Sequence, residues 1–311
     1  MDESIHALIA DNYLVAVSLV KQEKRFFNIL APTSNHLVTM DNKIELKLGK
    51  VQETLVLPLW GRAVESRKER PKLVDKKALE IIERIDYDFS LITKNMSWVS
   101  QLAWVARSLH VDQTINNFIK VHPFATIINI GCGLDTTYER IDNGHIRFYD
   151  LDLPDVIKLR KMFFNDTERR TSLACSFLDT HWFHQIENQN DVLFIAAGVF
   201  YYIEEKQIRD FFMTVAHQYP GSELFFDVAS PLGVKAANKK VIQDGGMDDS
   251  AKLKWGIKTA RTMEGWDKRI KLITEYPIFK GFKKGYSMKM KYGLMMSDVL
   301  KIMSMVHLKI E

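Results

Sequence analysis

From residue 125 onward, apolar runs of strand length alternate with helix-forming stretches. The run 191–197 is almost wholly apolar, as expected for a strand in a sheet buried on both faces. Helices are predicted from Pro154, over 204–217 and near 297–304. The alternation predicts an α/β fold with a mostly parallel sheet and right-handed crossovers. Its predicted strands are 125–131, 145–152, 171–177, 191–197, 223–228, 270–276 and 306–310.

The segment 44–122 has a helical pattern instead. Asp75 can cap a helix that runs through Arg84, and apolar residues recur every three or four positions from Trp98 to Leu109. Pro123 ends this helical region. We therefore expect a helical cap over 44–122 that contributes to the site of the core domain over 123–311.

The first 43 residues are harder to place. The apolar positions between Tyr13 and Val20 fit either a buried strand or a helix, and no chemical motif accompanies them. Residues 1–43 are therefore treated as an N-terminal extension of unknown role.

A glycine turn follows the first core strand, at Gly131-Cys132-Gly133. The next strand ends in two acids, Asp150 and Asp152, about 20 residues later. In a doubly wound fold, such glycines let the backbone approach a nucleotide and the acid accepts from ribose hydroxyls. A turn that merely joins strand to helix is the alternative, and the acids at the end of the next strand make it less favoured.

Two nucleotide cofactors remain open at this point. A nicotinamide cofactor needs G-x-G-x-x-G, but Thr136 stands where the third glycine belongs. S-adenosylmethionine has no pyrophosphate and needs only room at the turn and an acid for the ribose. The pattern favours S-adenosylmethionine.

The composition is that of an ordinary globular protein. Of its 311 residues, 46% are hydrophobic and 26% charged, and the net charge of +4 is too small to indicate nucleic-acid binding. Two cysteines do not suggest a secreted disulfide scaffold. The run Tyr13–Val20 is too short to span a bilayer, and the N-terminus lacks the basic start of a signal peptide. We expect a cytoplasmic enzyme without membrane or nucleic-acid partners and without a metal site.

A basic cluster stands near the C-terminus. Its simplest interpretation is a solvated face, and a patch for an anionic substrate is the alternative. The cluster consists of Lys280, Lys283, Lys284, Lys289 and Lys291.

Several motifs together resemble one known family, the leucine carboxyl methyltransferase superfamily of class I S-adenosylmethionine-dependent methyltransferases. The chain is most similar to its tetracenomycin-type polyketide O-methyltransferases, from about residue 44 onward. The resemblance implies a Rossmann-like, mostly parallel seven-stranded sheet with helices on both faces and an N-terminal helical cap. It rests on the segments 53–59, 62–66, 129–136, 150–154, 197–202 and 221–227, and on Arg107 five residues before Asp112.

The resemblance also implies roles for matching residues around the methyl donor. Arg107 would pair with the donor's carboxylate, as a buried anion requires. Gly131 and Gly133 would line the methionine part, and Asp152 would accept from the ribose, with Asp150 as the alternative.

Three further positions would complete the donor site. Leu178 and Asp179 would border the adenine, and Gly198 would leave space beneath the donor. Two positions depart from the common family pattern, since Ala197 stands where many relatives have glutamate and Thr137 where many have arginine.

The acceptor side is less defined. Tyr202 and Asp227 follow strand ends at the expected ligand edge, together with Tyr201, and are candidates to orient or deprotonate an acceptor. Packing is an equally good interpretation of each tyrosine. The segment 241–267, which contains Trp255 and Trp266, fits either a lid over the acceptor or a connector with core aromatics.

These residues favour an S-adenosylmethionine-dependent O-methyltransferase acting on a small-molecule hydroxyl or carboxylate. Alternatives are a protein C-terminal carboxyl methyltransferase and a non-catalytic protein that binds S-adenosylmethionine. An NAD dehydrogenase is a distant possibility, for want of the third glycine.

Overall fold

The structure is a computed structural model of the 311-residue chain. It describes residues 43–45, 50–87, 89, 97–187, 191–239 and 252–311. Nearly all of the N-terminal extension expected over 1–43 therefore lies outside the described residues.

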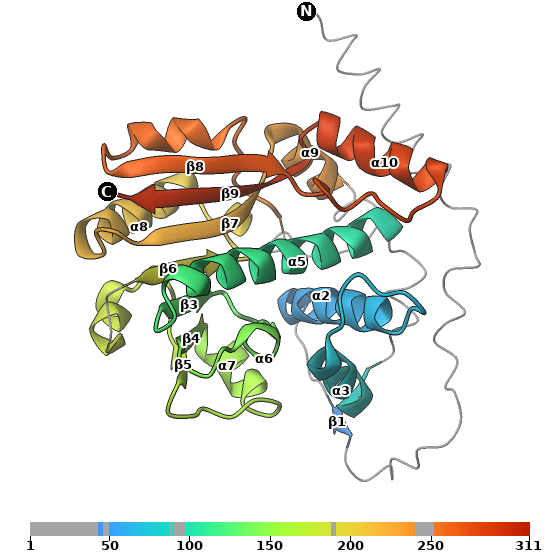
Figure 1. Ribbon diagram of the computed structural model, residues 1–311, viewed down its shortest axis with the longest axis horizontal. Coiled ribbons are helices and arrows are strands. Elements are labelled where there is room, and N and C mark those ends of the chain that lie inside the picture. Colours follow the sequence, from blue (N-terminus) through green and yellow to red (C-terminus); the bar gives the residue numbers. More distant parts are fainter. Residues whose placement is uncertain (1–42, 46–49, 88, 90–96, 188–190, 240–251) are drawn as a thin grey trace, which may run out of the picture.

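A seven-stranded sheet forms the centre of the molecule, in the order β5-β4-β3-β6-β7-β9-β8 (Figure 1). Its first five strands pair in parallel, and β9 is antiparallel to both neighbours. This confirms the predicted mostly parallel sheet. The strands are β3 (Thr126–Ile130), β4 (Arg147–Asp152), β5 (Arg170–Ala174), β6 (Val192–Ala196), β7 (Glu223–Ala229), β8 (Ile270–Pro277) and β9 (Met303–Ile310).

Helices cover both faces of this sheet. The long helix α5 (Trp98–Val121) packs on the face that presents Ile127 and Phe225, whereas α8 (Glu205–Gln218) packs on the face that presents Ile128 and Phe226 (Figure 1). Because both faces are covered, the central strands are apolar throughout, and β3 and β6 are buried at every position. Shorter helices join the strands: α6 (Tyr138–Ile141), α7 (Pro154–Arg160), α9 (Pro231–Lys239) and the 3-10 helices η5 (Thr180–Gln185), η6 (Phe200–Tyr202) and η9 (Ala260–Gly265).

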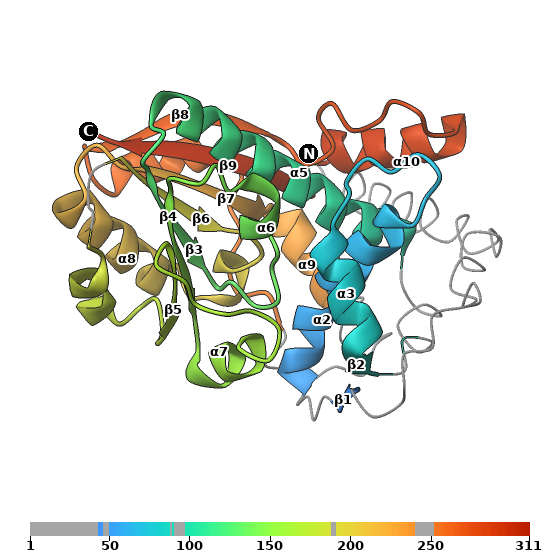
Figure 2. The same ribbon diagram turned by 60° about the horizontal axis from the view of Figure 1, so that its bottom comes forward.

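The segment 44–122, for which a helical cap is expected, contains two helices that lie beside α5 (Figure 2). They are α2 (Lys50–Ser66) and α3 (Lys76–Arg84), with a two-residue pairing between β1 (Ile44–Glu45) and β2 (Ile85–Asp86), whereas α5 itself packs on the sheet. Asp75 caps α3 as the sequence predicts, since its carboxylate accepts from the Ala78 N–H at 2.9 Å.

The C-terminal elements differ from the prediction. The helix expected near 297–304 is wrong in position, because α10 spans Met288–Val299 and β9 already begins at Met303. Ser287 fixes the start of α10 by accepting from the Met290 N–H, and Lys301 with φ +48° turns the chain into β9. None of the described helices is long and apolar enough to cross a membrane.

Candidate cofactor and active site

The glycine turn lies where β3 and β4 end side by side. Gly131 and Gly133 have φ of +61° and +46°, which favours glycine. A Cβ on Gly131 would lie 2.5 Å from the Val199 side chain, so this position has no room for one. The Gly133 N–H donates to Asp152 at 2.8 Å, which ties the turn to the end of β4.

The two acids of β4 have different surroundings. Asp150 is fully buried and accepts from Arg160 at 2.9 Å, Arg170 at 2.8 Å and Asn129 at 3.1 Å. The partners of Asp152 are two backbone N–H groups, those of Gly133 and Leu153, and its side chain is partly exposed. Burial raises the pKa of Asp152, although these N–H groups oppose it. Asp152 is therefore the acid whose oxygens face the more open surroundings.

Arg160 of α7 holds the glycine turn from behind. Its Nη1 donates to the carbonyls of Gly133 and Asp135, both at 2.8 Å, while its other Nη pairs with Asp150. The side chain is 1% exposed. Because Arg160 binds two carbonyls of the turn, it holds the turn in a fixed position.

Arg107 lies across the site, where β6 ends beside β7. Asp227, expected to follow a strand end, instead lies inside β7, because this strand continues to Ala229. The Nη1 of Arg107 donates to Asp227 at 3.0 Å and to the Tyr201 hydroxyl at 3.1 Å. Burial alone would lower the pKa of Arg107, but the Asp227 carboxylate outweighs it and the pKa is raised. A fixed, charged guanidinium thus stands at this edge of the sheet.

Gly198 brings the backbone against this guanidinium. With φ +86°, its N–H donates to Asp227 at 2.6 Å, and a Cβ there would lie 2.8 Å from Arg107 Nη1. Both oxygens of Asp227 are therefore engaged, one by Gly198 and the other by Arg107. The structure brings together Arg107, Gly198 and Asp227, which are distant in the sequence.

The two tyrosines of η6 complete this edge. Burial raises the pKa of both hydroxyls. Tyr201 is 8% exposed and bound to Arg107, whereas Tyr202 is the more open of the pair and stacks edge-on against it. Both remain protonated at neutral pH, so Tyr202 is able to donate a hydrogen bond to a neighbouring oxygen.

The comparisons with known proteins agree with this geometry. The model of the leucine carboxyl methyltransferase family matches residues 56–216, which is just over half of the chain. The chain belongs to this family. A curated relative, the tetracenomycin polyketide synthesis O-methyltransferase TcmP of Streptomyces glaucescens, is 30% identical over 224 residues, which is 70% of this chain and 80% of TcmP.

A second curated relative supports the same assignment, and a solved structure shows the same fold. An S-adenosyl-L-methionine-dependent methyltransferase of Gibberella zeae, dpfgK, is 28% identical over 61% of this chain and 69% of its own length. A DUF574 family protein of Streptomyces avermitilis has the same fold, with a TM-score of 0.54 at 10% identity over 85% of this chain and all of its own. The chain is thus a class I methyltransferase that uses S-adenosylmethionine.

The residues of this methyltransferase fit such a donor. A Cβ on Gly198 would lie 2.8 Å from Arg107 Nη1, so the glycine makes room for the guanidinium, and that buried guanidinium matches a carboxylate. Asp152 is the last residue of β4, the position from which we expect it to accept from the donor's ribose. For Asp150, the three bound partners argue against direct contact with the donor.

The adenine border remains a prediction. Leu178 packs partly against the core, and Asp179 caps η5 by accepting from the His181 N–H at 3.2 Å. His181 itself and His184 are exposed.

A buried ionic network behind the glycine turn was missed in the sequence. Asp75 accepts from Arg62 at 2.8 Å and from Arg140 at 3.0 Å, and Arg140 also pairs with Asp112. The Nη2 of Arg140 donates to the Thr137 hydroxyl at 3.1 Å, so an arginine contacts one of the two positions that depart from the expected family pattern. Local pattern assigned Asp75 to helix capping, and Arg62 and Asp112 were noted only as parts of family motifs, so nothing in the sequence paired these residues.

The methyltransferase's segment 241–267 is described from residue 252 onward. Trp255 is 2% exposed and Trp266 packs against Phe212, so both indoles belong to the core, one of the two alternatives open from sequence. The backbone N–H groups of Lys254 and Trp255 donate to the Tyr201 carbonyl, which places this segment beside the site. A lid remains a prediction, because 240–251 lie outside the described residues.

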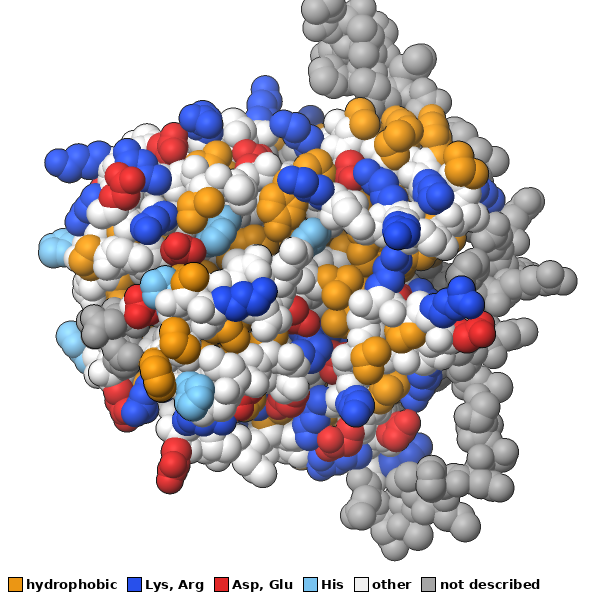
Figure 3. All heavy atoms as spheres, viewed as in Figure 1, with side chains coloured by type: hydrophobic (Ala, Val, Ile, Leu, Met, Phe, Trp, Pro, Cys, Tyr) orange, Lys and Arg blue, Asp and Glu red, His pale blue; other side chains and the backbone are white. Residues whose placement is uncertain are grey.

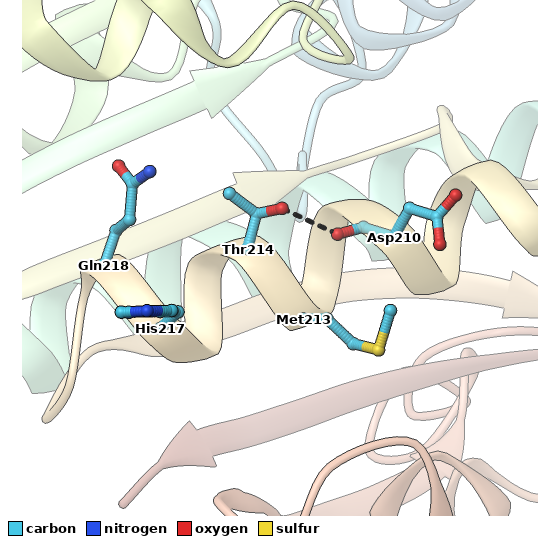
Figure 4. Close-up of a pocket in the computed structure, with 5 residues that line it drawn as sticks. All are labelled: Asp210, Met213, Thr214, His217 and Gln218. Carbon is cyan, nitrogen blue, oxygen red and sulfur yellow. Dashed lines mark hydrogen bonds between the residues drawn. The ribbon is translucent and has the colours of Figure 1, made fainter.

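A shallow hollow on the outer surface of α8 is unrelated to this site. It is formed by one helix alone, and Thr214 donates to the Asp210 carbonyl within it (Figure 4). Among the described residues, no group of three or more histidines, cysteines or acids could hold a metal ion.

Proposed function

We propose that this methyltransferase transfers the methyl group of S-adenosylmethionine to an oxygen of a small organic acceptor. The similarity to TcmP, named as an O-methyltransferase, supports this substrate class. The observation that carries the proposal is the buried Arg107 held between Gly198 and Asp227 at the ligand edge of the sheet.

The donor side of the proposal assigns each residue a contact. Arg107 binds the carboxylate of the donor, Asp152 accepts from its ribose, and the backbone of Gly131, Gly133 and Gly198 allows close approach. S-adenosylmethionine supplies a methyl group already activated on a sulfonium. The protein therefore mainly has to align the acceptor in line with that methyl group and exclude water.

The acceptor side assigns different roles to the two catalytic candidates. Asp227 has both oxygens bound and is fully buried, so it positions Arg107 and is not free to take a proton. Tyr202 keeps its proton, because burial raises its pKa, and it orients the acceptor by donating a hydrogen bond. Such a site suits an acceptor that is already ionised, so we favour a carboxylate over a neutral hydroxyl.

A matched acceptor panel tests this function. Purified protein is incubated with methyl-labelled S-adenosylmethionine and with aromatic carboxylic acids, the corresponding phenols, or peptides with a free C-terminal leucine. We expect label on a small acid, released from the methyl ester by mild base; label on a phenol would favour a hydroxyl acceptor instead. Labelling confined to the peptide terminus would favour the protein carboxyl methyltransferase alternative, which the family name itself raises.

The variant Tyr202→Phe separates the acceptor role from donor binding. We expect a lower kcat with unchanged affinity for S-adenosylmethionine, because only the hydroxyl is removed. Unchanged turnover in this variant would remove Tyr202 from the proposed mechanism.

We also place the reaction in the cytoplasm, because the two cysteines, Cys132 and Cys175, are free thiols.

A further inference from the structure

Helix α10 presents an apolar stripe to the solvent. Met288, Tyr292, Met295 and Val299 are 78%, 57%, 43% and 68% exposed. Their spacing of four, three and four residues puts them within about 60° of one another around the helix axis. The buried residues of α10 (Leu294, Ser297 and Asp298) face the protein, so the outer side of this helix is the apolar one.

This stripe stands out from the body of the protein. Figure 1 shows α10 at the outer edge of the molecule, and Figure 3 shows hydrophobic and basic side chains gathered over the same corner. Gly293 on the inner side packs against Trp98, the first residue of α5, with no room to spare, since a Cβ there would lie 3.2 Å from the indole. Helix α10 is therefore closely packed on its inner side, and we call its exposed stripe of Met288, Tyr292, Met295 and Val299 the ridge.

Lysines surround the ridge. Lys289 and Lys291 fall on its two sides around the helix, and the segment 278–302 contains six lysines and one acid, Asp298. That acid is nearly buried and is paired with Lys283. The surface around the ridge is therefore strongly basic in a protein whose total net charge is only +4.

We propose that α10 docks on an anionic phospholipid membrane surface, with the ridge inserted at the level of the lipid headgroups. An apolar stripe between lysines is the pattern of helices that lie in a membrane interface. A tyrosine on the ridge suits the headgroup region. The sequence alone favoured a solvated basic face and no membrane partner; the outward-facing ridge between those lysines is what changes that interpretation.

The type of basic residue favours lipid over protein as the partner. Protein interfaces are enriched in arginine and depleted of lysine, whereas anionic lipid attracts lysine as a charge without demanding a fixed geometry. The segment 278–302 contains six lysines and no arginine. A second copy of the chain would bring two such basic surfaces together, which their charges oppose.

Vesicle flotation with the full-length protein tests this proposal. We expect the protein to float with vesicles of phosphatidylcholine and phosphatidylglycerol but not with phosphatidylcholine alone, and to be released by high salt. Lys291→Gln should weaken partitioning by about fivefold, since each lysine near an anionic surface contributes about 1 kcal/mol. Lys120→Gln, at an exposed lysine of α5, is the control that should change nothing.

The chain offers a matched pair for the apolar contribution. Val299 and Val121 are each the last residue of a helix and are 68% and 72% exposed. Val299→Ser should reduce flotation, whereas Val121→Ser should not. Because both side chains are exposed, neither change should alter the melting temperature much.

Three results would overturn the proposal. They are equal recovery with neutral and anionic vesicles, no recovery with either, and equal effects of Val299→Ser and Val121→Ser. Sedimentation without lipid gives a fourth: if the wild type is a dimer that Val299→Ser turns into monomers, the ridge is an interface between two copies of the chain. Donor binding serves as the check that each variant is folded, and it does not depend on the nature of the acceptor.

Discussion

At the scale of single residues, Asp150 and Asp152 show how similar side chains acquire different tasks. Asp150 holds two buried guanidinium groups in place, while Asp152 accepts from two backbone N–H groups and is partly exposed. We predict that Asp152→Ala weakens binding of S-adenosylmethionine by about ten- to a hundredfold, because a hydrogen bond to a charged group contributes about 1.5–3 kcal/mol. Calorimetric titration measures this directly.

Two controls accompany that measurement. Glu168→Ala removes an exposed carboxylate and should leave affinity unchanged. Asp150→Ala should instead destabilise the fold by about 3–5 kcal/mol, because it leaves Arg160 and Arg170 buried without their shared partner. Full affinity in Asp152→Ala would show that the ribose is bound elsewhere.

Asp135 connects the glycine turn to acid stability. Burial opposes its ionisation, but Arg62 and Arg140 outweigh burial and hold the pKa of Asp135 below its ordinary value. A carboxylate with a lowered folded-state pKa stabilises the protein above its unfolded pKa of about 3.9 and loses that effect as the pH falls further. We predict that Asp135→Asn lowers the unfolding free energy equally at pH 7 and pH 5, and by less below about pH 4.

Urea unfolding across this range tests the prediction. An effect of Asp135→Asn that is constant down to pH 3 would mean that the charge on Asp135 contributes nothing. Glu168→Gln serves as the control at an exposed position, for which we expect a change within about 0.5 kcal/mol at each pH.

Residue types were easier to predict than their partners. The glycine turn, the acids of β4 and Arg107 could be identified because their chemistry depends on local spacing or on a family motif. The engagement of Asp227 by Arg107 joins positions 120 residues apart, and that of Asp75 by Arg140 joins positions 65 apart. Such pairs depend on tertiary packing, which no local pattern in one sequence contains.

At the scale of elements, the connection from β6 to η6 decides where Arg107 lies. Gly198→Ala adds a methyl group 2.8 Å from Arg107 Nη1 and forces a residue with φ +86° out of its favoured region. We predict loss of stability by about 1–2 kcal/mol from the backbone, together with at least tenfold weaker donor binding because the guanidinium is displaced.

Gly221→Ala is the matched control for this substitution. Gly221 has nearly the same φ, +84°, but nothing lies within 4 Å of the position of its Cβ. The Gly221→Ala variant should lose a similar unfolding free energy, measured by urea unfolding, and keep its affinity for S-adenosylmethionine. Equal affinities in the two variants would show that Gly198 is not needed to make room for Arg107.

Element boundaries were predictable where the hydrophobic pattern was unambiguous. The buried strands β3 and β6 fall within the predicted 125–131 and 191–197 because strands covered on both faces have continuous apolar runs. The error near 297–304 arose where Met, Leu and Lys give no clear period. There, α10 buries one face and exposes another apolar face, so its pattern resembles neither an ordinary surface helix nor a buried one.

At the scale of the whole molecule, the sheet brings all the proposed donor contacts to one edge. The alternation of strands and helices predicts parallel pairing, but not that β9 lies between β7 and β8 in antiparallel orientation. That placement depends on which strands bury the most surface together. It matters for the site because β9 pairs along the whole of β7, from Glu223 to Ala229, and thereby fixes the strand that carries Asp227.

Donor binding should also be visible in the stability of the complete chain. A ligand that binds only the folded state, present at 100 times its Kd, adds about 2.7 kcal/mol to the unfolding free energy. For a protein of this size we predict a rise in Tm of about 5 °C with S-adenosylmethionine or S-adenosylhomocysteine. NAD should give no rise, because the third glycine of its motif is replaced by Thr136, a fully buried residue whose hydroxyl bonds to Asp75. Asp152→Ala should reduce the shift and Val121→Ser should preserve it; a rise with NAD and none with either adenosyl ligand would refute the assignment of the site.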